Sequence, residues 1–202
     1  MSKKGFTLAE VLITLGVIGV VAAMTMPTVI EHHQKQIVVS RMKKFYSTFN
    51  QALQMSVNEF GDMRTWTFPT NIYDSAGSNV FWETYLKPHV RYINVKQNKV
   101  TPWPTSGVLV YQPDGSAFNL SGTWVTFYPV ADKDKNPTRD IFIFTINSDK
   151  NQLLPLGHDI TNYNTLKSHV FGCAKNKYAD SVRYCAEIIM RNGWQISDDY
   201  PW

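Results

Sequence analysis

The chain starts with Lys3-Lys4-Gly5-Phe6-Thr7-Leu8-Ala9-Glu10, and the next 20 residues, Val11 to Ile30, contain no charged side chain. A helix of that length is about 30 Å long, which matches the hydrocarbon core of a bilayer. Because the lysines lie on the N-terminal side of the apolar run, we expect the N-terminus to stay in the cytoplasm while the rest of the chain crosses outward.

The segment Gly5-Phe6-Thr7-Leu8-Ala9-Glu10-Val11-Leu12-Ile13 resembles the processing site of type IV pilins and type II secretion pseudopilins. In that family a membrane peptidase cuts after the glycine, and the new N-terminal residue is N-methylated. The resemblance covers only about the first 30 residues. It implies cleavage between Gly5 and Phe6, with residues 1–5 as the leader and Phe6 as the methylated end.

Glu10 is the single carboxylate that precedes the apolar run. A charge at the centre of a membrane helix costs roughly 2.5–3.5 kcal/mol on insertion scales, so such groups usually mark function. Cleavage would create an ammonium at Phe6. In a bundle of identical helices, Glu10 of one subunit can neutralise the Phe6 ammonium of its neighbour and so fix the axial register. The alternative is an ordinary glutamate at the membrane boundary.

Gly19 and Pro27 lie inside the apolar run. Pro27 lacks a backbone donor and is expected to kink or loosen the helix. The resemblance implies more, namely that the segment from Gly19 to Pro27 unwinds on assembly; the alternative is a simple kink.

A cleavable secretory signal ending near Ala22-Ala23 is the competing interpretation of the N-terminus, but Glu10 interrupts the region that such a signal keeps apolar.

From Glu31 the pattern becomes amphipathic. Apolar or small residues recur every three or four positions, which predicts one face of a helix: Met42, Phe45, Tyr46, Phe49, Ala52, Leu53, Ser56 and Phe60. Gly61 is the expected C-terminal stop. A helix from Phe6 to Phe60 would be about 80 Å long. The sequence thus divides into a leader (1–5), a transmembrane or filament-core helix (6–30), its amphipathic continuation (31–61) and a globular head (62–202).

The head reads as antiparallel strands followed by a helical tail. We expect strands at 108–111, 117–120, 123–130 and 140–146, and helices at 79–86, capped by Ser78, and at 178–191. Pilin heads are commonly a sheet laid on the helix, so the expected fold class is α+β, in the lollipop arrangement that the resemblance implies.

Two cysteines are present, Cys173 and Cys185. An even, small number of cysteines in an exported chain suggests one disulfide, which the resemblance also implies.

The formal net charge is +4 with Lys3 and Lys4 included, hence 4 − 2 = +2 after removal of the leader. So small a charge does not favour nucleic-acid binding. We find no phosphate-binding glycine loop, nucleophile elbow or paired metal motif, and we expect no enzyme activity.

The segment 131–140 is rich in acidic and amide side chains, and it resembles a loop of pilin-like proteins. Its oxygen ligands have spacings that a hard cation such as Ca²⁺ can use: Asp132, Asp134, Asn136 and Asp140. A glycine of the family pattern is replaced by Lys135, and three basic side chains already supply positive charge. A turn held by local hydrogen bonds is the alternative, and no other cofactor is indicated.

Taken together, these features predict a pilin or pseudopilin, a structural subunit of a type IV pilus or type II secretion filament. It would lie first in the bacterial inner membrane and then in a filament. The implied partners are other pilin copies, the prepilin peptidase and methyltransferase, an assembly ATPase and its membrane platform protein. The second hypothesis is a minor pilin or competence pseudopilin whose head binds DNA or secreted cargo.

Overall fold

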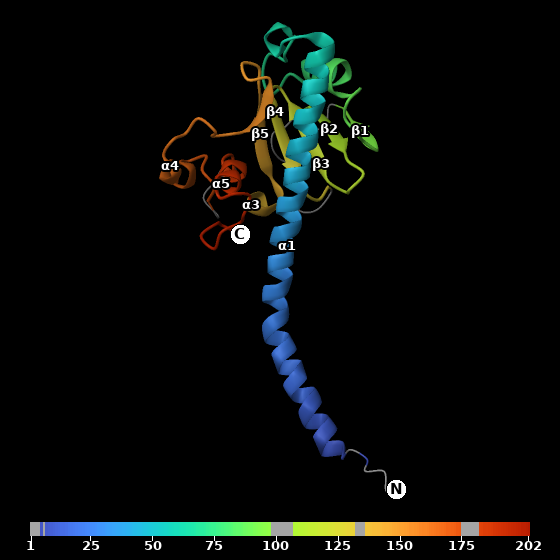
Figure 1. Cartoon of the computed structure of the whole chain (residues 1–202), viewed down its shortest axis with the longest axis vertical. Coiled ribbons are helices and arrows are strands. Elements are labelled where there is room, and N and C mark those ends of the chain that lie inside the picture. Colours follow the sequence, from blue (N-terminus) through green and yellow to red (C-terminus); the bar gives the residue numbers. More distant parts are fainter. Residues whose placement is uncertain (1–4, 6, 98–106, 132–135, 175–181) are drawn as a thin grey trace. The chain divides into compact units, whose positions relative to one another are not determined.

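The computed structural model describes residues 5, 7–97, 107–131, 136–174 and 182–202 (Figure 1). The chain divides into two compact units, Met1–Ile37 and Val38–Trp202. A single helix, α1 (Leu8–Phe60), contributes its first part to the first unit and the remainder to the second. The predicted class is confirmed: a long N-terminal helix packs, by the part that belongs to the second unit, against an antiparallel sheet.

In the first unit, α1 passes through Gly19 and Pro27 without a break in its helical assignment. Of the helices in the described residues, α1 alone is long and apolar enough to cross a membrane. None of the residues in the most apolar 18-residue stretch of α1 is buried by the rest of the chain. From Val11 to Ile30 the helix is therefore free of charged side chains and is not covered by the rest of the chain.

In the second unit, α1 has one buried face. The predicted stripe is confirmed for Met42, Phe45, Phe49, Ala52, Leu53 and Ser56, and Val38 extends it by one turn. Tyr46 is only partly buried, and Phe60 stays 38% exposed because it is the last residue of the helix. Gly61 ends the helix with a φ of +81°, a left-handed conformation that favours glycine.

Within the described residues the sheet has six strands, all antiparallel and in chain order. They are β1 (Asn94–Lys96), β2 (Val108–Tyr111), β3 (Ala117–Ser121), β4 (Trp124–Tyr128), β5 (Phe142–Asn147) and β6 (Gln152–Pro155). The four central strands were predicted. The two edge strands were not, because three or four residues are too few to show a clear alternation of apolar and polar side chains.

Phe45 of α1 joins the helix to the sheet. Its ring stacks on Phe127 with centroids 4.4 Å apart, and it also contacts Phe118 at 5.6 Å and Phe144 at 5.7 Å. These three rings come from β3, β4 and β5, where Phe118 pairs with Phe127 across the ladder. One helical side chain therefore meets three neighbouring strands in the centre of the core.

Short helices complete the second unit: η1 (Met63–Thr65), α2 (Ser75–Phe81), the π-helix η2 (Trp82–Leu86), α3 (Pro137–Asp140), α4 (Tyr163–Ser168) and α5 (Cys185–Arg191). The predicted cap at Ser78 is wrong. The helix begins at Ser75 because the Asp74 carboxylate accepts a hydrogen bond from the Gly77 amide at 2.8 Å.

The C-terminal region also begins its helix later than predicted. Part of the expected helix, residues 178–181, lies outside the described residues, and the turn at 182–184 precedes α5. The structure contains the disulfide between Cys173 and Cys185, whose Cα atoms are 4.8 Å apart. In the chain-entropy model a loop of this size stabilises the fold by roughly 2–3 kcal/mol. The disulfide therefore links α5 to the segment that follows α4.

The position of Phe45 leads to a stability prediction. Phe45→Ala removes a ring that is 2% exposed and leaves a cavity facing three strands. The free energy of unfolding should fall by about 3–5 kcal/mol. Chemical denaturation of the full-length chain, followed by tryptophan fluorescence, measures it. Ser47→Ala, at an exposed position of the same helix, is the matched control and should change little. Equal stability of the two variants would contradict the described core.

Candidate processing and assembly site

The predicted cleavage position lies just before the start of α1. Gly5 is exposed, and nothing lies within 4 Å of the place where a Cβ would stand. Since α1 begins at Leu8, the Gly5–Phe6 bond precedes the helix. Exposed backbone outside regular structure is where proteases cut. Phe6 itself lies outside the described residues, and cleavage between Gly5 and Phe6 stays a prediction.

Thr7 and Glu10 close the N-terminal end of α1 by a reciprocal pair of hydrogen bonds. The Thr7 backbone amide and hydroxyl both donate to Glu10 Oε2 at 2.8 Å. The Glu10 amide donates in turn to Thr7 Oγ1 at 3.3 Å. This is a capping box, which satisfies backbone donors that the first turn of a helix leaves open. It explains why the helix starts at Leu8.

This role of Thr7 was not among the predictions from the sequence. The signal was present as Thr7-Leu8-Ala9-Glu10, because a threonine followed three positions later by a glutamate is the usual pattern of a capping box. Glu10 thus has two features that bear on its function. It is bound to its own helix, and it stands at the start of an apolar surface.

That apolar surface extends from the capping box along the first unit. Its large side chains are between 42% and 77% exposed: Leu8, Val11, Leu12, Ile13, Leu15, Val17, Ile18, Val20, Val21, Met24, Met26, Val29 and Ile30. A contiguous apolar patch of this extent is rare on a monomeric soluble protein, and it marks a surface that a membrane or other protein covers.

The hydroxyls within the apolar run are satisfied by the helix itself. Thr14 donates to the Glu10 carbonyl at 3.0 Å and to the Val11 carbonyl at 2.9 Å, and Thr25 donates to the Val21 carbonyl at 3.0 Å. This removes their need for a water partner. Pro27 supplies no donor, so the helix lacks one hydrogen bond at that turn. Unwinding between Gly19 and Pro27 on assembly stays a prediction.

The suggested calcium ligands are only partly described. Asp132 and Asp134 lie outside the described residues. Asp140 was predicted to start a strand, but it is the last residue of α3, and β5 begins at Phe142. Asp140 is only 3% exposed, and its carboxylate accepts a hydrogen bond from the Asn136 backbone amide at 2.9 Å. Across the described part of the chain, no group of three or more His, Cys, Asp or Glu side chains is placed to hold a metal ion.

Comparison with known proteins gives two matches to protein families. Residues 1–26 match the prokaryotic N-terminal methylation motif, so the processing signal is of the type IV pilin and pseudopilin kind. Residues 28–202 match a family described as a family of unknown function (DUF6613). No curated protein and no solved structure showed significant similarity to the chain. The chain therefore carries a prepilin-type methylation motif and belongs to the DUF6613 family.

Proposed function

We propose that this protein is a structural subunit, a pilin or pseudopilin, of a bacterial type IV pilus or type II secretion filament. The observation that carries the proposal is the combination of a prepilin-type motif with a capped, uncovered apolar helix. After cleavage at Gly5, Phe6 becomes the methylated N-terminus. The helix then passes from the lipid of the inner membrane to a bundle formed with other copies.

The need to keep apolar surface from water accounts for both locations. Each buried CH₂ group contributes about 0.8 kcal/mol, so the exposed side chains from Val11 to Ile30 strongly favour a lipid or protein environment. Lipid covers them before assembly, and neighbouring helices cover them afterwards. Because both environments are apolar, the hydrophobic effect does not itself drive extraction from the membrane. We therefore include an assembly ATPase and its platform protein among the partners, besides the prepilin peptidase and methyltransferase.

The geometry of Glu10 supports its role in setting the register. Both Thr7 donors use Oε2, and within the described residues no hydrogen bond is found at Oε1. A carboxylate offers about four lone-pair sites, so the capping box leaves acceptors for the Phe6 ammonium of a neighbour. Thr7 in turn restricts the orientation of the carboxylate. A single axial offset between neighbours then satisfies both charges in an environment that strengthens their attraction.

Processing gives the first test of this function. Mass spectrometry of protein taken from the membrane or from filaments should find a chain that starts at N-methylated Phe6. Gly5→Leu should block this, because it replaces the glycine after which the resemblance places the cut. Lys4→Gln changes the leader without touching the cut and serves as control. A mature chain that starts near Met24 would instead indicate a secretory signal and would overturn the proposal.

The second test separates the charge of Glu10 from its capping role. Glu10→Ala removes both, whereas Glu10→Gln keeps an oxygen for the Thr7 donors and loses the charge. If the carboxylate pairs with a neighbouring ammonium, both variants should be cleaved and inserted normally, and both should lose most of their incorporation into filaments. The ratio of subunit in sheared filaments to subunit in membranes measures this. Normal incorporation of the Gln variant would show that capping alone matters.

A further inference from the structure

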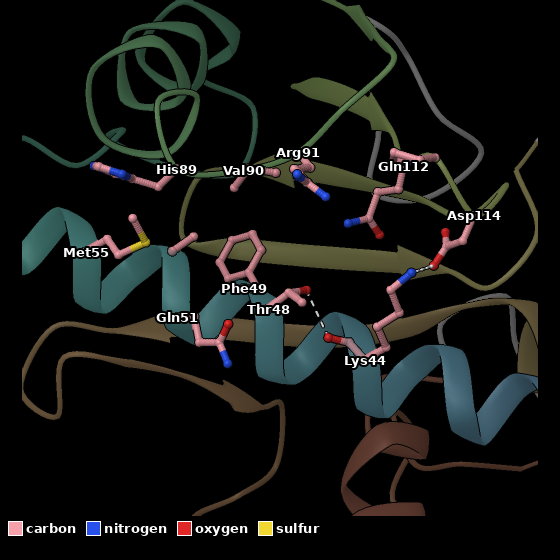
Figure 2. Close-up of a pocket in the computed structure, with 12 residues that line it drawn as sticks. Lys44, Thr48, Phe49, Gln51, Met55, His89, Val90, Arg91, Gln112 and Asp114 are labelled. Atoms are coloured by element: carbon pink, nitrogen blue, oxygen red, sulfur yellow. Dashed lines mark hydrogen bonds and ion pairs between the residues drawn. The ribbon is translucent and has the colours of Figure 1, made fainter.

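A groove of about 410 Å³ lies in the second unit, between α1 and two loops (Figure 2). One loop contains His89, Val90 and Arg91, and the other is the turn between β2 and β3. Phe49 and Ala52 of α1 are buried beneath it, while Met55, 52% exposed, and Val90 also line it. The groove therefore combines an apolar floor with a polar rim.

Two donors on the rim face the groove. Figure 2 shows the Arg91 guanidinium and the Gln112 amide directed toward the space above Phe49. Arg91 is exposed and makes no hydrogen bond or ion pair with the described residues. Ser116 Oγ lies 2.9 Å from Gln112 Oε1 and 2.5 Å from Asp114 Oδ1, so its hydroxyl contacts both side chains at this part of the rim.

The one carboxylate that lines the groove is already neutralised. Lys44 Nζ lies 2.8 Å from Asp114 Oδ2, as the dashed line in Figure 2 shows. Partial burial raises the pKa of Asp114, but hydrogen bonds from Lys44 and Ser116 outweigh it and lower the pKa to about 2. The Lys44–Asp114 pair thus contributes no net charge near neutral pH, and Arg91 leaves the groove positive. This favours an anionic ligand with an apolar neighbour.

We propose that the groove binds a surface segment of a second copy of this chain, with a carboxylate held by Arg91 and Gln112 and an apolar side chain packed on Phe49 and Met55. The proposal rests on the proposed function, since it places the groove between neighbouring subunits of the filament. An arginine can hold a carboxylate by two parallel hydrogen bonds, and the Gln112 amide adds a third donor.

The same chain offers suitable carboxylates. Three exposed aspartates form no ion pair with the described residues: Asp149 in the β5–β6 turn, Asp159 between β6 and α4, and Asp198 after α5. A weak contact suffices here, because helices gathered through their apolar runs raise the effective concentration of neighbouring heads to about the millimolar range.

Photo-crosslinking in filament-forming cells tests the contact. A photoreactive amino acid at Met55 should give a product of twice the mass of the processed chain, and its cross-linked peptide should contain Asp149, Asp159 or Asp198. The same amino acid at Tyr73, which is 68% exposed and does not line the groove, is the control and should give much less of that product.

Charge variants then test the chemistry. Arg91→Glu and Gln112→Glu should each lower the yield of the Met55 product by about fivefold, and Arg91→Lys, which keeps the charge but loses the paired hydrogen bonds, should lower it less. Adding Asp149→Arg, Asp159→Arg or Asp198→Arg to Arg91→Glu should restore the yield for the one aspartate that binds.

Two outcomes would overturn the proposal while leaving the proposed function intact: processed filaments without the Met55 dimer, or a Met55 product containing only a different protein. Chains that are neither cleaved after Gly5 nor assembled would refute the proposed function itself, and this inference with it.

Discussion

An apolar helical surface without a cover is the constraint on which the rest of this protein depends. From Val11 to Ile30 no charged side chain interrupts the helix, and the chain itself buries no residue of its most apolar 18-residue stretch. The large side chains there must be shielded by lipid or by another protein, because leaving them in water is costly. The second unit has a different arrangement, since its part of α1 buries one face against its own sheet. One helix therefore presents an uncovered apolar surface in its first part and forms an intramolecular core in its second.

The helix start is built for an apolar environment. In lipid the first backbone N–H groups of a helix find no water, so each unsatisfied group costs several kcal/mol. Thr7 and Glu10 meet part of this need through their reciprocal hydrogen bonds. The cap also brings a negative charge to the edge of the apolar surface, where a charge without a partner is unfavourable. In the proposed function, the partner of this charge is the ammonium that cleavage after Gly5 would create at Phe6.

The sequence was sufficient for the parts of the fold that follow a regular period. The stripe from Met42 to Ser56 could be predicted because apolar residues recur at helical spacing over four turns, and the central strands could be predicted from β-branched and aromatic runs bounded by turn residues. The edge strands β1 and β6, and the short helix α4, are too brief for a period to emerge. The start of α2 differs from the prediction because Asp74, and not Ser78, caps the helix.

Of the candidate sites, the processing motif could be predicted from the sequence, whereas the groove could not. Gly5, Phe6 and Glu10 follow from a local motif, which matches a known methylation signal. The spacing of Thr7 and Glu10 in the same motif also indicates a capping box, although the capping role of Thr7 was not predicted. The groove could not be predicted, because it brings together Lys44 and Met55 of α1, Arg91 of a loop and Gln112 after β2, which only the tertiary fold places side by side. The contacts of Ser116 with Gln112 and Asp114 likewise depend on the turn between β2 and β3.

The most direct measurement of the central claim is the environment of the apolar helix before and after assembly. The two cysteines of the chain form a disulfide, so Ile18→Cys can carry a spin label selectively. In membranes the label should be accessible to oxygen and shielded from a water-soluble nickel reagent. In filaments it should remain shielded and show strong dipolar coupling to labels on neighbouring helices, which pack at about 8–10 Å. A label in filaments that is open to nickel and uncoupled from its neighbours would contradict the claim that other copies cover this surface.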